Sequence, residues 1–266
     1  MTVENENSEK KVQMLEQLFV PYSLATNMPF VTYDEATFMN QVWIFTTPED
    51  VQKFVERYAD KKFLLKGMII KKERSPEFFM ELHSMGIKEI VFCNKNTETK
   101  LDLAKTGAFP DFSKLPENRR PIFNQELQLS TIYFFQEVKR EGVDQEKEKD
   151  KLEKLAEKMY ANIANARFLM PFQTEEVEGK KKIRFPILTH QNGHKFQPIF
   201  SDAVQYDKYV KAHKQAEGIR VILVDMEGLK KNLLDNVAGY MLNVEGYCHV
   251  LTKKQLEYIG RRFKSE

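Results

Sequence analysis

The chain has 266 residues, of which 42% are hydrophobic and 30% are charged, a balance that is typical of globular domains and excludes a largely disordered chain. Its 41 Lys and Arg residues nearly match its 39 Asp and Glu residues, which leaves a net charge of +2. Phosphate-binding surfaces need a clear basic excess, so we expect no nucleic-acid partner. The polar start of the chain and the lack of an apolar run of about 20 residues predict neither a signal peptide nor a membrane span.

The chain contains two cysteines, Cys93 and Cys248. Two thiols so far apart are too few for a disulfide framework or for a thiolate zinc site. They are typical of a protein that is kept in a reducing compartment, so we expect a cytoplasmic location.

A leading helix and a pair of strands are predicted first. Apolar residues spaced by three or four predict a helix over 8–18. The segment 29–33 opens with a proline and reads as a strand, and a second strand ends at Thr46-Thr47. Thr47 is followed by a proline and two acidic residues, which is the pattern of a helix start.

The helix after Thr47 leads into a buried strand over 63–70 and a second helix that begins at Ser75. Gly86 is expected to end that helix, and a short strand over 90–94 follows it. Residues 100–103 continue this region without a convincing helix.

The middle of the chain differs from what precedes it. Residues 109–121 hold three prolines and predict a turn-rich connector. Apolar residues at helical spacing then predict helices over 122–140 and 146–165, separated by Gly142. The alternating charges of 145–150 are typical of a solvated helix face.

The last region repeats the first set of elements. Strands are expected from 186 and up to 199–202, with Asn192-Gly193 between them as the signal of a tight type I′ hairpin turn. A helix, a strand over 219–224 and a helix over 226–237 follow. Strands then come at 240–243 and 248–251, and Thr252 caps a last helix.

Because the two regions contain the same elements in the same order, we interpret them as diverged copies of one domain. Each copy predicts a mixed sheet with helices packed on it, an α+β fold. We expect copy one with its leading helix at 1–107, a connector and helix at 108–148, and copy two with its leading helix at 149–266.

The two copies share three short motifs: an apolar residue before proline (Val20-Pro21, Met170-Pro171), a proline-led strand ending in Thr (Pro29-Phe30-Val31-Thr32, Pro186-Ile187-Leu188-Thr189), and a late strand ending in Asn94 or Asn243. With these motifs each copy resembles the N-terminal domain of SseB-family bacterial proteins. The resemblance implies a small α+β domain with a non-enzymatic role.

Four polar residues are candidates for a structural or surface site. His190 and His194 flank the Asn192-Gly193 turn, where a hairpin brings both imidazoles together. A zinc site needs three or four ligands, so we expect an ordinary hairpin and no metal. Asn94 and Asn243 end matching strands, where an Asn side chain usually bonds its own turn; alternatively, the pair lines equivalent surfaces of the two copies.

No pattern of catalytic residues is found. The chain lacks a Gly-rich phosphate loop and a Gly-x-Ser-x-Gly elbow. The basic cluster Lys180-Lys181-Lys182 is best explained as an edge strand that resists pairing. No cofactor is expected.

We therefore expect a non-catalytic, protein-binding or scaffold module of the bacterial cytoplasm, and the sequence leaves open whether it forms homo-oligomers. The alternatives are an enzyme with an unrecognised site at the junction of the two copies and, from the resemblance alone, a secretion-linked accessory protein.

Overall fold

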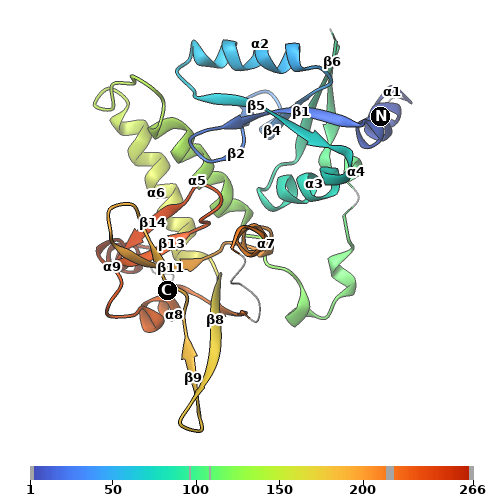
Figure 1. The fold of residues 1–266 in the computed structure, drawn as a ribbon. Coiled ribbons are helices and arrows are strands. Elements are labelled where there is room, and N and C mark those ends of the chain that lie inside the picture. Colours follow the sequence, from blue (N-terminus) through green and yellow to red (C-terminus); the bar gives the residue numbers. More distant parts are fainter. Residues whose placement is uncertain (1–2, 96, 108, 214–218, 264–266) are drawn as a thin grey trace. The chain divides into compact units, whose positions relative to one another are not determined.

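The structure, a computed structural model, describes residues 3–95, 97–107, 109–213 and 219–263 (Figure 1). Helices and mixed β-sheets alternate along it, so the expected α+β fold is confirmed. The chain divides into two compact units: unit 1 comprises Met1–Arg120 and Ile132–Glu153, and unit 2 comprises Pro121–Thr131 and Lys154–Glu266. Among the described residues, no helix combines the length and apolar character that crossing a membrane requires.

The elements of the first part of the chain are α1 (Val3–Met14), β1 (Gln17–Ser23), β2 (Met28–Pro29), β3 (Val31–Asp34), β4 (Met39–Phe45), α2 (Pro48–Ala59), β5 (Leu65–Lys71), η1 (Lys72–Arg74), α3 (Ser75–Ser84), β6 (Glu89–Asn94), β7 (Thr97–Asp102), α4 (Leu103–Thr106), η2 (Phe112–Lys114) and η3 (Glu117–Arg119). Two longer helices follow: α5 (Gln125–Val138) and α6 (Lys149–Asn165). Both cross the boundaries between the units, because each unit takes one end of each helix.

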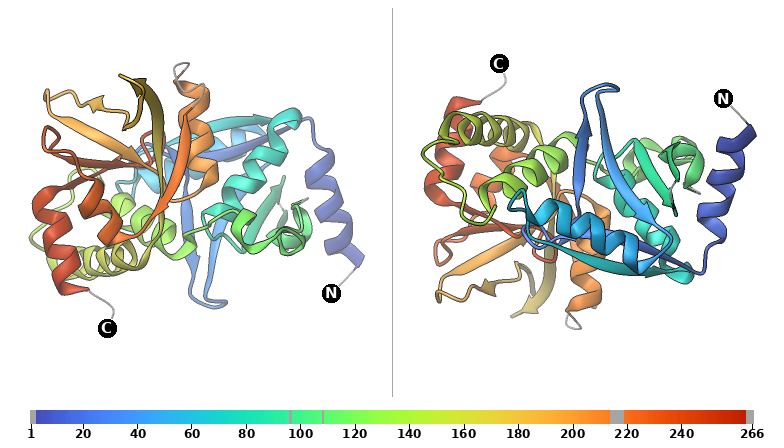
Figure 2. Two further views of the ribbon diagram at one scale, coloured as in Figure 1. Left: turned by 90° about the horizontal axis from the view of Figure 1, so that it is seen from below. Right: turned by 90° about the horizontal axis from the view of Figure 1, so that it is seen from above.

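A single sheet organises unit 1. Its strands lie in the order β2-β1-β4-β6-β7, with β3 paired to β4 and β5 paired to β1. The pair β4–β6 is parallel, and the other pairs are antiparallel. Helices α2 and α3 lie on opposite sides of this sheet (Figures 1 and 2). Figure 2 also shows that the β3–β4 hairpin projects from unit 1.

Helix α2 begins where the sequence predicts it. The Thr47 hydroxyl accepts a hydrogen bond from the Asp50 backbone N–H, and Pro48 and Glu49 follow the cap. Val51 and Phe54 are buried, and they join an aromatic cluster with Phe30, Phe45 and Val91 on one side of the sheet. The cap and the cluster together fix the position of α2 over β4.

The remaining elements are β8 (Phe168–Val177), β9 (Lys180–Arg184), β10 (Leu188–Thr189), β11 (Lys195–Ile199), α7 (Ala203–Ala212), β12 (Arg220–Val224), α8 (Met226–Asn232), β13 (Gly239–Leu242), β14 (His249–Thr252) and α9 (Lys253–Arg262). They form a sheet in the order β10-β11-β13-β14 and a second sheet in the order β12-β8-β9. An isolated bridge between Leu169 and Phe200 joins the two sheets.

The two units have the same strand connections. In unit 1, β3 and β4 form a hairpin, β4 pairs in parallel with β6, and β6 pairs antiparallel with β7. In unit 2, β10, β11, β13 and β14 pair in the same way. In each unit one residue pair joins the remaining strands to this set of four. The pair is Phe19 with Phe45 in unit 1 and Leu169 with Phe200 in unit 2. The first and last regions of the chain thus share one topology.

Two helix predictions were too long because tertiary contacts override local propensity. Leu18, placed in the leading helix, lies in β1, which pairs on both of its edges. Helix α8 ends at Asn232 and not at Val237. The buried Gln197 amide donates to the Asn232 carbonyl and accepts from the Leu234 N–H, so a side chain takes the place of the next helical turn.

Two turn predictions also differ. Residues 103–106, where no helix was expected, form α4, which is capped by Asp102. The Asn192-Gly193 hairpin is not a type I′ turn, since only Gly193 has positive φ (82°). The Gly193 N–H donates to the His190 carbonyl, and the His190 N–H donates to the His194 carbonyl. This is a three-residue loop with glycine in the left-handed position.

Gly239 is the first residue of β13. Its φ is +154°, and a Cβ atom added to it would lie 2.0 Å from the Leu251 carbonyl oxygen of β14. We predict that Gly239→Ala lowers the free energy of unfolding by about 2–3 kcal/mol, because the two strands must separate. The matched control is Gly142→Ala, at φ +64° with nothing within 4 Å, which should cost only about 1 kcal/mol of backbone strain. Urea unfolding of both variants measures the difference, and equal losses would contradict the prediction.

Candidate functional site

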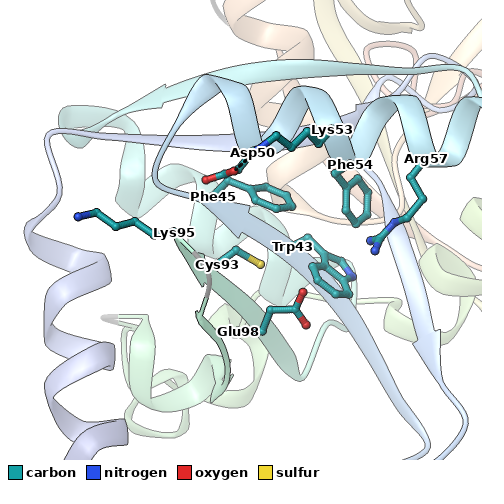
Figure 3. A pocket seen from close by; sticks show the side chains of 9 residues that line it. All are labelled: Trp43, Phe45, Asp50, Lys53, Phe54, Arg57, Cys93, Lys95 and Glu98. Carbon is teal, nitrogen blue, oxygen red and sulfur yellow. Dashed lines mark hydrogen bonds and ion pairs between the residues drawn. The ribbon is translucent and has the colours of Figure 1, made fainter.

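The candidate site is a groove in unit 1 between α2 and the sheet (Figure 3). One hollow of about 260 Å³ is lined by Trp43, Phe45, Asp50, Lys53, Phe54, Arg57, Cys93, Lys95 and Glu98. A second hollow of about 610 Å³ is lined by Thr32, Tyr33, Asp34, Glu35, Gln41, Trp43, Tyr58, Val91, Glu98 and Lys100. The two hollows share Trp43 and Glu98 in their linings and so adjoin each other; together they are called the groove.

Strand register builds the floor of the groove. Alternate residues of a strand point to the same face. On β4 these are Gln41, Trp43 and Phe45. The parallel pairing of β4 with β6 sets Trp43 beside Val91 and Phe45 beside Cys93. The antiparallel pairing of β6 with β7 extends both rows, to Lys100 and Glu98 respectively. The floor therefore changes from aromatic on β4 to charged on β7.

Helix α2 forms the wall of the groove. Figure 3 shows Phe54 and Arg57 on α2, on the side where Trp43 rises from the floor. The Trp43 ring lies 5.2 Å from the Phe54 ring, centroid to centroid, and its Nε1–H donates to the Thr32 hydroxyl at 3.0 Å. These contacts hold Trp43 in one orientation.

Arg57 lies on an aromatic platform. Its guanidinium carbon is 5.0 Å from the ring centroid of Phe54 and 5.6 Å from those of Trp43 and Tyr58. In the part of the chain that the structure describes, no carboxylate pairs with it. A guanidinium that packs on aromatic rings keeps the N–H donors at its own edge available. A planar anion such as a carboxylate can accept hydrogen bonds from them.

The acidic end of the groove is organised by Asp34. Its carboxylate accepts hydrogen bonds from the Lys100 ammonium, the Thr37 hydroxyl and the Ala36 N–H. These bonds, with that from Lys100 the strongest, lower the pKa of Asp34 to about 2. Gln41 donates to both Asp34 and Glu89, so this end is a fixed, charged boundary of the groove.

Cys93, on the floor, is a buried thiol. Burial is the main cause that raises its pKa to about 12, with a smaller contribution from Glu98. Because the thiolate is the nucleophilic form, Cys93 is unsuited to nucleophilic attack at neutral pH. Among the described residues, no group of three or more His, Cys, Asp or Glu side chains is placed to hold a metal ion.

The two candidate histidines lie at the turn of the β10–β11 hairpin, as the sequence predicts. The Asn192 N–H lies 3.4 Å from the His190 Nδ1, and the His194 N–H donates to the Asn192 side-chain oxygen. The His190 ring makes an edge contact with Phe196. Both histidines thus shape a turn in unit 2, and they do not join the groove.

The two candidate asparagines lie in different surroundings. Asn94 is partly exposed, and its side-chain oxygen accepts a weak bond from the Thr46 hydroxyl at 3.4 Å. Asn243 is fully buried, with φ +53°. The Thr46 N–H bonds the Cys93 carbonyl, whereas the matching Ser201 N–H bonds the Asn243 side-chain oxygen. Asn243 is therefore level with Cys93, one residue away from the match with Asn94 expected from the sequence.

Asn243 belongs to a buried polar cluster of unit 2. Its amide donates to the Ser201 hydroxyl at 2.8 Å and to the Tyr247 hydroxyl at 2.7 Å. The Asp202 carboxylate, which caps α7, accepts from Ser201 and from the Gln128 amide, both at 2.7 Å. The Gln128 side-chain oxygen has no hydrogen-bond partner among the described residues. The cluster connects α5, α7 and the end of β13.

The sequence analysis did not identify Trp43 or Arg57 as site residues. Trp43 is the only tryptophan of the chain and alternates with Gln41 and Phe45, a pattern that puts the three on one face of a strand. Arg57 follows Phe54 at helical spacing and so lies on the same side of α2. Their meeting depends on how α2 crosses β4, which spacing alone does not define.

The buried cluster predicts that the free energy of unfolding depends on pH. Burial raises the pKa of Asp202 despite its hydrogen bonds, so the folded chain holds this proton more tightly than the unfolded chain. The contribution of Asp202 to the free energy of unfolding is therefore fully present below its ordinary pKa of about 4 and falls as pH rises from there through the raised folded value. In Asp202→Asn this fall should disappear, and a flipped Gln128 amide can accept the new N–H.

Urea unfolding at a series of pH values tests this expectation. Asp207→Asn is the matched control, because Asp207 is exposed on the same helix and forms an ion pair with Lys211 outside the buried cluster. It should keep the wild-type pH dependence. If Asp202→Asn also kept it, Asp202 would not be its source.

Comparison with known proteins gives one family match. Residues 147–250 match the model of the SseB protein N-terminal domain. Among solved structures, Tic22 from Plasmodium falciparum is 12% identical, covering 96% of each chain at a TM-score of 0.23, and Anabaena Tic22 (protein transport) is 10% identical, covering 100% of each chain at a TM-score of 0.22. The search of curated proteins found no match. The resemblance to SseB proteins that the sequence predicts is thereby confirmed over residues 147–250.

Proposed function

We propose that this chain is a non-catalytic binding protein of the bacterial cytoplasm whose unit 1 groove holds an extended segment of a partner protein. The observation that carries the proposal is the pair of adjoining hollows beside Trp43, with an aromatic wall and a charged far side. Its buried thiol, Cys93, has a raised pKa, which favours binding over nucleophilic chemistry there. Both cysteines are free thiols, as expected in a reducing compartment.

The shape of the groove favours a peptide over a compact small molecule. From Gln41 to Phe45 the floor runs for roughly 13 Å along β4, which matches about four residues of an extended chain. The second hollow adjoins the first at Trp43 and Glu98, so an extended segment laid across Trp43 would contact both. Small-molecule sites usually enclose most of their ligand, whereas this groove is open along its length.

We also propose that the chain contains two SseB-like copies, at 1–107 and 149–266, with a connector and helix at 108–148. The shared strand connections and the equivalent joints, Phe19 with Phe45 and Leu169 with Phe200, support this proposal. The copies differ at the groove. Pro198 of β11 takes the place of Trp43, since each residue lies two positions before the joint. Unit 2 thus has no tryptophan at the place that Trp43 occupies in the groove of unit 1.

Binding is tested with a displayed library of random peptides without Trp, of about eight residues, enough to span the groove with flanks. We predict that the wild-type chain selects peptides that change the fluorescence of its single tryptophan, Trp43. Glu98 is exposed on β7, so a ring introduced there should occlude the floor without disturbing the core. We expect Glu98→Phe to weaken the selected peptides by about tenfold or more.

The matched control is Glu257→Phe, which replaces an exposed glutamate on α9 of unit 2. It should bind the selected peptides as the wild type does. The proposal fails if no peptide is selected, or if the selected peptides bind Glu98→Phe as tightly as they bind Glu257→Phe.

A further inference from the structure

We propose that the groove selects segments that carry an acidic side chain, and that Arg57 binds its carboxylate. This inference rests on the proposed function and specifies the chemistry of the partner. It follows from the position of one unpaired cation on an aromatic wall, and from the charges that surround it.

Arg57 differs from Arg120 and Arg140, two arginines of unit 1 that donate hydrogen bonds to protein groups. Arg140 forms an ion pair with Glu137 at 3.1 Å and donates to a backbone carbonyl, and Arg120 donates to two backbone carbonyls. In contrast, Arg57 contacts only aromatic rings among the described residues. Its five N–H donors are therefore available, in the fork geometry that fits a carboxylate with two parallel hydrogen bonds.

The aromatic platform makes Arg57 a better receptor than a free surface cation. Phe54, Trp43 and Tyr58 all lie within 5.6 Å of its guanidinium carbon, measured to their ring centroids. The rings limit the side-chain conformations of Arg57, so less entropy is lost when a carboxylate binds. They also exclude water from one side of the guanidinium, which strengthens an ion pair on its open side.

The neighbouring charges favour an anion at this position. Lys53 and Lys95 line the same hollow as Arg57. Of its two acidic residues, Asp50 is already engaged by the Thr47 hydroxyl at 2.7 Å and by the Lys53 ammonium at 3.4 Å. Glu98 is the remaining acid, and it extends from β7 on the opposite side of the floor. Because Lys53 and Asp50 pair with each other, Arg57 is the cation of the α2 wall that has no carboxylate partner among the described residues, and the carboxylate of the segment belongs there.

The carboxylate comes from a side chain within the segment and not from a chain end. The groove continues past Trp43 into the hollow that is bounded by Asp34 and Glu35. A segment that ended at Arg57 would leave this hollow unfilled. A segment that passes through both hollows offers Arg57 an Asp or Glu side chain and extends its backbone along β7.

Unit 2 supports the assignment by contrast. Ala212 stands as many residues after the cap Asp202 as Arg57 does after the cap Thr47. Pro198 and Ala212 take the places of Trp43 and Arg57. Tyr209 keeps an aromatic ring at the place of Phe54, where it packs against Phe200, so unit 2 differs by the missing tryptophan and the missing cation. Carboxylate selection is therefore a property of the unit 1 groove.

The test uses the peptides selected by the full-length chain, each compared with a version in which its Asp or Glu is changed to Asn or Gln. On the wild type we expect the amide version to bind about tenfold more weakly, because a charge-assisted pair is lost. On Arg57→Leu, which keeps an apolar side chain over the rings, both versions should bind within about twofold of each other. On Lys66→Leu, which removes an exposed cation of β5 outside the lining of both hollows, the tenfold difference should remain.

Amidation of the peptide C-terminus is the second comparison, and it should leave binding unchanged. Thermal unfolding of Arg57→Leu and Lys66→Leu checks that both variants are folded. The inference is overturned if the selected peptides lack acidic residues, if the difference persists on Arg57→Leu, or if amidation abolishes binding. In each of these cases a loss of binding on Glu98→Phe would still support the groove, whereas binding that is unaffected by Glu98→Phe would reject the proposed function itself.

Discussion

The parallel pairing of β4 with β6 is the constraint on which the groove depends. It sets Phe45 beside Cys93 and Trp43 beside Val91, and β7 extends these two rows to Glu98 and Lys100. Parallel neighbours need a crossover connection, and here the segment between them contains α2, β5 and α3. The same connection that closes the sheet therefore also supplies the helix that forms the wall of the groove.

Side chains on this face of the sheet are buried to different extents, and the groove lies where buried side chains give way to exposed ones. Phe30, Phe45 and Phe54 are almost fully buried and fix α2 over β4. Their burial removes apolar surface from water and stabilises unit 1. The helix does not reach β7, so Glu98 and Lys100 stay exposed. Trp43 lies at the boundary, where one part of its ring packs in the core and another borders the groove.

Unit 2 uses the same strand connections for a different purpose. At the position level with Cys93 it has Asn243, whose side chain replaces a backbone hydrogen bond and joins Ser201 and Asp202 in a buried network. A buried carboxylate is costly unless it is hydrogen-bonded, and Asp202 is bonded by Ser201, Gln128 and the Gln205 N–H. One topology thus supports an open aromatic groove in unit 1 and a closed polar cluster in unit 2.

The amino-acid sequence by itself determined the order of most strands and helices, the helix caps at Thr47 and Thr252, and a resemblance to SseB N-terminal domains that the family match confirms over residues 147–250. These features depend on residues that lie close together along the chain, and local physical chemistry is sufficient for them. Only the tertiary structure decided where α8 ends, that Gly239 lies against Leu251, and that Arg57 rests on Trp43. Each of these depends on segments far apart in sequence, whose contact is fixed by strand register and by the crossing of a helix over a sheet.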